Sequence, residues 1–292
     1  MDALRTPDDR FADLPDFSYA PRYCEVGDGL RMAFIDEGPR DAPVILMLHG
    51  EPSWSFLYRH VIRTVVAAGL RAVAPDLAGF GDSEPDPPGT WHRHAASLER
   101  LRAELGLGRV ALGGHDWGLS IALRWAADHR DLVSALVLSN GGAALVEGRW
   151  HPVAEDMRGS SEGEAFMRYL SRDLFDAGMR QISRHMTAQA RDEYFKCLAD
   201  DARRAGTLEL FRSADAEELV PYVTEPARLA VPTLVLWGAH DDVARMSVAE
   251  HFHDITPGSR LVVLEQAGHA LYDDAPQEAS AAIADFLAVE LL

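Results

Sequence analysis

The sequence has little cysteine and contains no long apolar run. Two cysteines, Cys24 and Cys197, occur among 292 residues, and this number favours free thiols in a reducing compartment over a disulfide framework. No apolar run reaches the roughly 18 residues that a membrane-spanning helix requires, and residues 1–11 lack the apolar centre of a secretion signal. We therefore expect a cytoplasmic protein with no membrane partner.

Positive charge is also scarce. Lysine and arginine number 28 against 46 acidic residues, for a formal net charge of −18, and Lys196 is the only lysine. Such a balance argues against binding to nucleic acid or to anionic membrane surfaces. The histidines near positions 92–94 and 251–253 lack a converging set of further ligands. We expect no metal ion and no organic cofactor.

The arrangement of apolar residues indicates α/β architecture. Short β-rich runs alternate with helical stretches, as in a mainly parallel sheet. The runs expected to form strands are residues 30–38, 43–50, 70–76, 109–114, 132–140, 232–238 and 260–268. The main helices are expected at 53–68, 91–105, 117–130, 248–255 and 276–291. The run at 43–50 is apolar throughout, which is typical of a central strand buried on both faces.

The alternation breaks once, over about ninety residues between Asn140 and Val231 that carry no strand signal. They contain amphipathic helical patterns, with a capping box predicted at Ser161 and Glu164 and a helix cap at Thr187. An insertion here would cover the carboxyl ends of the strands, where open α/β sheets bind ligands. We expect a core in two parts, 1–144 and 231–292, with a helical cap at 145–230.

The stretch GGHDWG, residues 113–118, has the glycine spacing of a nucleophile elbow, with Gly114 and Gly118 around Asp116. The two glycines would let the chain turn sharply from strand to helix and expose the side chain between them. Two further polar residues follow later strands: Asp241 in WGAHDD and His269 in QAGHAL. The order nucleophile, acid, histidine is that of a hydrolytic triad on such a sheet.

An aspartate at the elbow changes the expected chemistry. A carboxylate is already an anion at neutral pH, so it needs no base to attack. It suits a saturated carbon that bears a leaving group, or a strained ring. His269, held by Asp241, would then activate a water to hydrolyse the ester. The backbone N–H groups of Glu51 and Trp117 would form the oxyanion hole of that step.

The stretch HGEPSWSFLYRHVI, residues 49–62, makes a family resemblance specific. Together with GHDWG, the opening residues 1–23 and APDLAGFGDSEPD at 74–86, it resembles the haloalkane dehalogenases, in particular the subfamily whose loop reads His-Gly-Glu-Pro. The resemblance implies an α/β-hydrolase fold, with a mostly parallel eight-stranded sheet, flanking helices and a helical cap. It implies Asp116 as nucleophile, His269 as base and Asp241 as acid. Related subfamilies carry the acid where this chain has Asn140.

The resemblance also implies donors for a departing halide. Trp117 offers an indole N–H, which has no competing acceptor. Other dehalogenases place an asparagine where this chain has Glu51, and the Glu-type subfamily uses a tryptophan from the cap, so Trp150 is the candidate second donor. The implied substrates are a small apolar haloalkane and water, giving an alcohol, halide and a proton. The chain would act as a monomer or small homo-oligomer.

Rival functions remain open. An epoxide hydrolase shares the aspartate nucleophile but needs acidic hydroxyls from the cap, for which the sequence offers Tyr169, Tyr194 and Tyr222. A fluoroacetate-type dehalogenase would need arginine at position 117. A serine esterase is disfavoured because Ser120 lies beyond the elbow. A non-catalytic ligand-binding protein would not require all three polar residues at strand ends.

Overall fold

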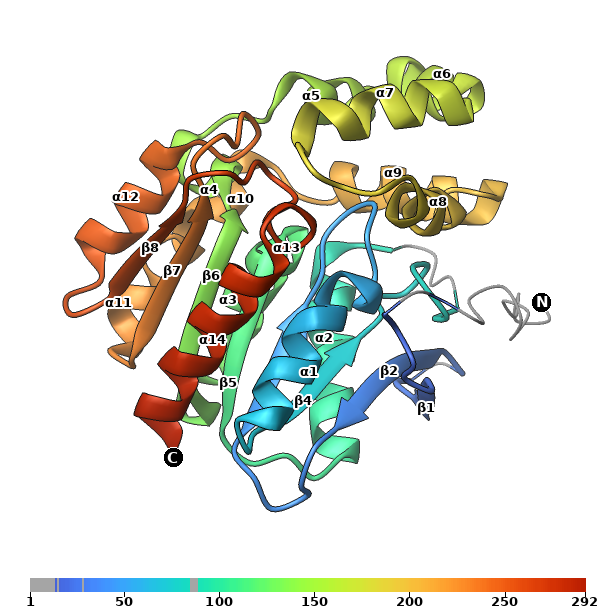
Figure 1. Ribbon diagram of the computed structural model, residues 1–292. Helices are drawn as coiled ribbons and strands as arrows, with labels where there is room; N and C mark the ends of the chain where they lie inside the picture. Colours follow the sequence, from blue (N-terminus) through green and yellow to red (C-terminus); the bar gives the residue numbers. More distant parts are fainter. Residues whose placement is uncertain (1–13, 15, 28, 85–88) are drawn as a thin grey trace.

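The computed structural model describes residues 14, 16–27, 29–84 and 89–292, and an eight-stranded sheet lies at its centre (Figure 1). The opening residues 1–13, which carried part of the resemblance and the expectation about a secretion signal, lie outside the described residues. The strands are β1 (Arg22–Glu25), β2 (Arg31–Glu37), β3 (Val44–Leu48), β4 (Arg71–Pro75), β5 (Val110–Asp116), β6 (Val133–Gly141), β7 (Thr233–Gly238) and β8 (Arg260–Leu264).

The sheet order is β1-β2-β4-β3-β5-β6-β7-β8. Strand β2 runs antiparallel to β1 and β4, and every other neighbouring pair is parallel. All residues of β3 and β4 are buried, because helices cover both faces of a parallel sheet. The predicted fold class is therefore confirmed. The sequence reading missed β1, a four-residue edge strand whose RYCE pattern gives little apolar signal.

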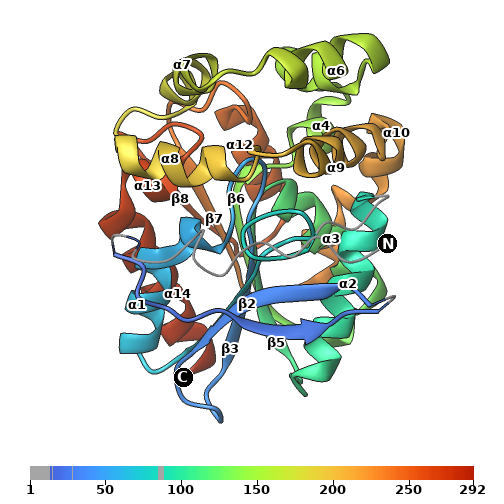
Figure 2. The same ribbon diagram turned by 90° about the vertical axis from the view of Figure 1, so that its right-hand side faces the viewer.

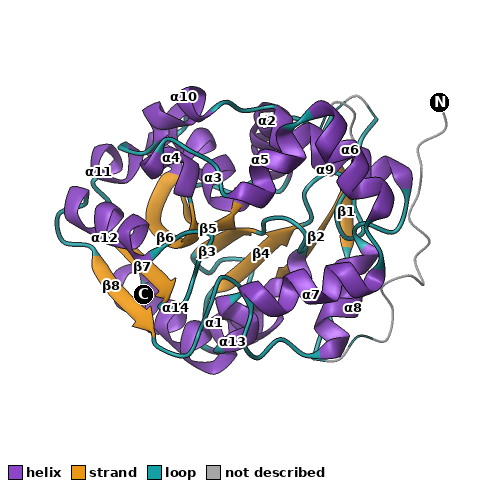
Figure 3. Ribbon diagram, turned by 90° about the horizontal axis from the view of Figure 1, so that it is seen from above, coloured by secondary structure: helices purple, strands orange, loops and turns teal. Residues whose placement is uncertain are grey.

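Helices cover the two faces of the sheet, as the view from above shows (Figure 3). One face carries α1 (Arg59–Ala67) and α14 (Pro276–Leu291); the other carries α2 (Trp91–Glu104), α3 (Trp117–Asp128) and α12 (Met246–Ile255). Shorter pieces are η1 (Ser55–Tyr58), η2 (Arg130–Leu132), α4 (Ala143–Glu147), α10 (Ala216–Leu219), η3 (Val220–Tyr222), α11 (Glu225–Leu229) and α13 (Leu271–Asp274). No helix in the described part of the chain is long and apolar enough to span a membrane.

Five helices between β6 and β7 lie over the carboxyl ends of the strands (Figures 1 and 2). They are α5 (Pro152–Arg158), α6 (Ser160–Tyr169), α7 (Arg172–Ile182), α8 (Ala188–Lys196) and α9 (Asp201–Arg212), and we call them the cap helices. The predicted cap at Thr187 is confirmed, since its hydroxyl accepts the N–H of Ala190 at 3.1 Å. The capping box was wrong: α6 starts after Gly159, so Ser161 is inside the helix and its hydroxyl bonds to Glu162.

A buried arginine fixes the cap helices to the core. Arg203 of α9 is 3% exposed, and its guanidinium donates to the carbonyl oxygens of Gly79 at 2.6 Å and Gly81 at 3.0 Å. Both glycines have positive φ, 85° and 50°, which favours glycine. This loop is held in turn by Asp76, whose carboxylate accepts the N–H groups of Ser55 and Asp82, both at 2.8 Å. The cap thus rests on a rigid turn.

We expect Arg203→Met to lower the free energy of unfolding by about 3 kcal/mol, because two charge-assisted hydrogen bonds are lost and two buried carbonyl groups remain unpaired. Urea denaturation followed by circular dichroism measures the difference. Arg149→Met is the control: its side chain is 57% exposed and pairs only with Glu147 among the described residues, so a change below about 0.5 kcal/mol is expected. Equal losses of unfolding free energy in both variants would contradict the role of Arg203 in fixing the cap helices to the core.

Candidate active site

Asp116 occupies a strained turn at the end of β5. Its φ of 53° and ψ of −124° lie outside the regions that non-glycine residues favour, at a cost of about 1–3 kcal/mol. A Cβ at Gly114 would lie 2.5 Å from Cα of Leu119, and one at Gly118 would lie 2.1 Å from the carbonyl oxygen of Leu48. Both glycines are therefore required for α3 to turn back so closely against the sheet, as the elbow pattern predicts.

Two backbone N–H groups face the Asp116 carboxylate. The N–H of Glu51 donates to Oδ1 at 3.0 Å, and the N–H of Trp117 also bonds to the carboxylate and favours its charged form. A Cβ at Gly50 would lie 2.3 Å from the same Oδ1, so the loop after β3 approaches this closely only with glycine. The structure thus brings together the two donors that the sequence reading assigned to an oxyanion hole.

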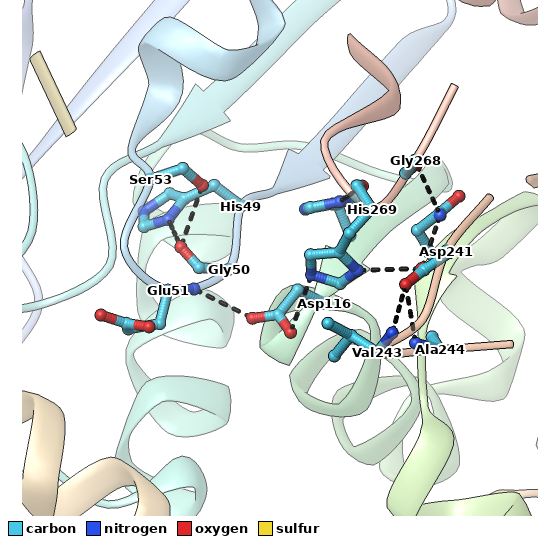
Figure 4. Close-up of polar contacts among 12 residues, drawn as sticks. His49, Gly50, Glu51, Ser53, Asp116, Asp241, Val243, Ala244, Gly268 and His269 are labelled. Atoms are coloured by element: carbon cyan, nitrogen blue, oxygen red, sulfur yellow. Dashed lines mark hydrogen bonds and ion pairs between the residues drawn. The ribbon is translucent and has the colours of Figure 1, made fainter. Parts of the chain in front are cut away.

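His269 lies between two carboxylates (Figure 4). Its Nε2 is 3.5 Å from Oδ2 of Asp116, and its Nδ1 is 2.9 Å from Oδ2 of Asp241. The other oxygen of Asp241 accepts the N–H groups of Val243 at 2.7 Å and Ala244 at 2.9 Å. These bonds fix the acid, the acid orients the imidazole, and the imidazole faces the elbow. The three predicted triad residues are therefore adjacent.

Asn140 is a site residue that the sequence reading did not assign. It is the last but one residue of β6, and its amide nitrogen donates to Oδ2 of Asp241 at 2.6 Å and to the carbonyl of Gly268 at 3.2 Å. Its amide oxygen accepts the N–H of Gly238 at 3.0 Å. One side chain therefore ties together the strand end before Asp241 and the loop before His269. The signal that the sequence offered for this role was a polar residue near the end of β6, the strand next to the one that carries the elbow.

The charges around His269 stabilise its protonated form. Burial opposes that form, but the carboxylates of Asp241 and Asp116 outweigh it and raise the pKa of His269 to about 10. Burial likewise opposes the anion of Asp116, yet the hydrogen bond and charge of His269 lower the pKa of that carboxyl. Both shifts favour an imidazolium at His269 beside an ionised Asp116.

Neighbouring ionisable groups stay neutral. Burial, followed by the charge of Asp116, raises the pKa of the Glu51 carboxyl to about 8, so at neutral pH it adds no second anion beside Asp116. Burial lowers the pKa of His115 to about 4. The Nε2 of His115 is 2.9 Å from the carbonyl oxygen of His269; because a carbonyl only accepts, this nitrogen carries the proton. His115 therefore packs behind the base.

A cavity of about 370 Å³ lies between the elbow and the cap helices. Asp116, Glu51 and His269 line its floor, and apolar side chains form most of its walls, among them Met157, Phe166, Leu170, Phe175 and Met179. This lining suits an uncharged, apolar ligand.

An aromatic cluster forms one side of the cavity. The rings of Trp117 and Trp150 lie 5.1 Å apart at 31°, and Phe211 meets Trp117 edge-on at 5.4 Å. The indole nitrogen of Trp150 is buried and has no hydrogen-bond partner within the described residues. Both predicted halide donors therefore line the cavity.

The three cap tyrosines do not reach the cavity. Tyr169 is 73% exposed. The hydroxyl of Tyr194 donates to Oδ2 of Asp273 at 2.7 Å, and Tyr222 packs edge-on against Trp91. None of them is among the cavity-lining residues. Helical patterns placed these tyrosines in the cap, but only the packing of the helices decides which way each side chain points.

Across the described ranges, no group of three or more His, Cys, Asp or Glu residues could hold a metal ion.

Residues 43–276 match a protein family described as alpha/beta hydrolase fold. A haloalkane dehalogenase from Mycolicibacterium paratuberculosis is 35% identical over 263 residues, 83% of this chain and 84% of that relative. Another haloalkane dehalogenase, from Mycobacterium marinum, is 44% identical over 158 residues, which are 51% of this chain and 52% of that relative. That match therefore spans about half the length of the relative. The solved tetrameric structure of the haloalkane dehalogenase DpaA from Paraglaciecola agarilytica NO2 is 27% identical, with a TM-score of 0.79, covering 96% of this chain and 97% of that one.

We expect the imidazole of His269 to titrate near pH 10 in the resting protein, measured by NMR. Asp241→Asn should lower this pKa because one of the two carboxylates loses its charge. Since the folded pKa exceeds the ordinary value of 6.5, the stabilisation from His269 is complete below about pH 6.5 and is lost as the pH rises through about 10. A His269 that titrates at its ordinary value in the unsubstituted protein would contradict this electrostatic arrangement.

Proposed function

This chain belongs to the haloalkane dehalogenase family of α/β hydrolases, and we propose that it hydrolyses small apolar haloalkanes to an alcohol, halide and a proton. The observation that carries the proposal is the Asp116 carboxylate, held at a strained elbow below an apolar cavity and 3.5 Å from His269. Residues 145–230 are the proposed cap, and residues 1–144 and 231–292 the core.

In the proposed first step, Asp116 attacks the carbon that bears the halogen. A bond forms from carboxylate oxygen to carbon, and the carbon–halogen bond breaks with its electron pair on the halide. The product is an alkyl ester of Asp116. Trp117 and Trp150 stabilise the halide through their indole N–H groups. The unpartnered indole nitrogen of Trp150 supports its part, since an unpaired buried donor costs free energy unless a ligand accepts from it.

In the second step, His269 removes a proton from water, and the resulting hydroxide attacks the ester carbonyl of Asp116. The N–H groups of Glu51 and Trp117 stabilise the oxyanion. Esterification itself prepares the base. The ester of Asp116 carries no charge, so His269 loses one of the two carboxylates that raise its pKa and more readily becomes the neutral base. The bond between the carbonyl carbon and the alkoxy oxygen then breaks. The alkoxide takes the proton that His269 removed from water and leaves as the alcohol, and the new carboxyl of Asp116 loses its proton to restore the carboxylate.

Epoxide hydrolysis is less well supported. Opening an epoxide produces an alkoxide that needs an acidic hydroxyl, and none of Tyr169, Tyr194 and Tyr222 lines the cavity. A departing halide needs no proton, and the aromatic side of the cavity offers the indole N–H groups of Trp117 and Trp150 as donors to it. Dehalogenation therefore fits the described residues better.

We further propose that the enzyme is cytoplasmic, works without a metal or organic cofactor, and acts as a monomer or small homo-oligomer. Cys24 and Cys197 are free thiols in the structure, which agrees with a reducing compartment. Water and the haloalkane are then the only reactants.

The decisive test is the intact mass of His269→Ala after incubation with 1-bromobutane. Without the base, hydrolysis should stall and the protein should gain one butyl group. Adding Asp116→Asn should abolish the adduct, because the amide is a poor nucleophile. Incubation with 1,2-epoxybutane is the parallel arm: a hydroxybutyl adduct there, with none from 1-bromobutane, would move the enzyme to the epoxide hydrolases. No adduct from either would refute the proposed nucleophile.

Trp150→Phe should weaken bromide binding by about tenfold or more, because one hydrogen bond to an anion is lost while the aromatic packing is kept. Inhibition of turnover by added bromide measures the affinity. Trp91→Phe is a matched control: the indole nitrogen of Trp91 is also buried and unpartnered among the described residues, but it does not line the cavity. If both variants bind bromide like the parent, Trp150 is only a packing residue.

A further inference from the structure

Asp274 joins the loop that carries His269 to the cap helices, and the proposed chemistry does not use it. It lies in α13, shortly after His269, and is 8% exposed. Its Oδ2 accepts the N–H of Gly268 at 2.8 Å, and its Oδ1 accepts the hydroxyl of Ser183 at 2.6 Å. One carboxylate thus bonds to the residue before the base and to the end of a cap helix.

The cap side of this link is a tight turn around one oxygen. Oδ1 of Asp274 also accepts the N–H groups of Arg184 at 2.8 Å and His185 at 2.7 Å. The Ser183 hydroxyl in turn accepts the N–H of Met186 at 3.1 Å. Residues 183–187 connect α7 to α8, and Figure 2 shows both helices on the same side of the molecule as α13. Asp274 therefore holds the first three residues of this connection directly, and Met186 through Ser183.

Backbone contacts bring the same two segments together. The N–H of Ala270 donates to the carbonyl of Ile182, the last residue of α7, at 3.3 Å. A Cβ at Gly268 would lie 2.8 Å from that carbonyl oxygen, so the approach requires glycine. The residues on both sides of His269 thus lie against the carboxyl end of α7.

The helix held in this way is a wall of the cavity. Phe175, Met179 and Ile182 of α7 line it, as does His269. We propose that Asp274 is a positioning residue for the second step: it fixes the His269 loop relative to α7, so that the base and the cap wall keep one relative position. The inference rests on the proposed function, because it concerns the step in which His269 activates water.

The two chemical steps should respond differently to loss of this link. Alkylation depends on Asp116, which the β5–α3 elbow holds without any bond from Asp274 among the described contacts. Hydrolysis depends on the placement of the imidazole, and a displacement of about 1 Å can cost a factor of about 100 in rate. The expected signature of a positioning role is therefore a slowed second step with an unchanged first step.

Asp274→Asn is the test variant. Both oxygens of Asp274 accept hydrogen bonds, whereas an amide has one acceptor oxygen and one NH₂ donor. In one orientation the NH₂ faces the donors of Ser183, Arg184 and His185, and in the other it faces the N–H of Gly268, so one set of hydrogen bonds is lost in either case. Rapid-quench mass measurements with 1-bromobutane follow formation and hydrolysis of the butyl ester. We expect formation within about twofold of the parent and hydrolysis slowed by about tenfold or more. Equal slowing of both steps, or of neither, overturns the proposal.

Two further variants keep the test decisive. Ser183→Ala removes one cap donor and leaves the Gly268 bond. It should displace the His269 loop less than Asp274→Asn does, so we expect hydrolysis to slow by about two- to fivefold. Unchanged hydrolysis would count against the cap link.

Asp273→Asn is the matched control. Asp273 is the neighbouring buried acid of the same helix, and it bonds to Arg59 and Tyr194. It should leave the ratio of the two rates unchanged even where stability falls, and a changed ratio would mean a general effect of α13.

Hydrogen exchange measures the link independently of any reaction. The amides of Gly268, Arg184 and His185 donate to Asp274, so they should exchange faster together in Asp274→Asn and not in Asp273→Asn. Parent-like exchange at these amides in Asp274→Asn overturns the link itself. If His269→Ala forms no butyl ester at all, the proposed function fails, and the second-step role fails with it, while the exchange result still decides whether Asp274 couples the segments.

Discussion

The turn at Asp116 is the constraint on which the rest of the site depends. Here the chain reverses from strand to helix at Asp116, with a positive φ at a non-glycine position, and the carboxylate faces the cavity. Such strain persists when the surroundings over-determine it. Here the surroundings are the buried strands on both sides of β5, the helix α3 packed behind the turn, and glycines at 50, 114 and 118, where any side chain would collide.

The electrostatics of the site follow from placing two acids around one imidazole. In the resting state, Asp116 and Asp241 keep His269 protonated, and burial strengthens their effect by excluding water. Glu51, a third acid at the same place, is held neutral by burial and by Asp116. The proposed reaction uses this balance, since an ester at Asp116 removes one of the two charges. The state of the base is then set by whether the nucleophile is occupied.

Buried polar side chains join the cap helices to the sheet and its loops. Arg203 fixes α9 to the loop after β4, and Asp274 fixes the connection after α7 to the loop that carries His269. Each link places a charge in a buried position, where it must be fully hydrogen-bonded to be tolerated. The apolar cavity therefore lies between the cap helices and the core, which directional hydrogen bonds join.

The sequence alone determined the sheet, the elbow and the polar residues at strand ends, because apolar runs, glycine spacing and residue order are local properties of the chain. From these, Asp116, Asp241 and His269 could be predicted as neighbours, since parallel strands end at one edge. Only the tertiary structure decided which cap side chains reach the cavity, that Asn140 holds Asp241, and that Asp274 bridges to Ser183. Those contacts join segments far apart in the chain, and helical periodicity gives the apolar face of a helix without giving its partner.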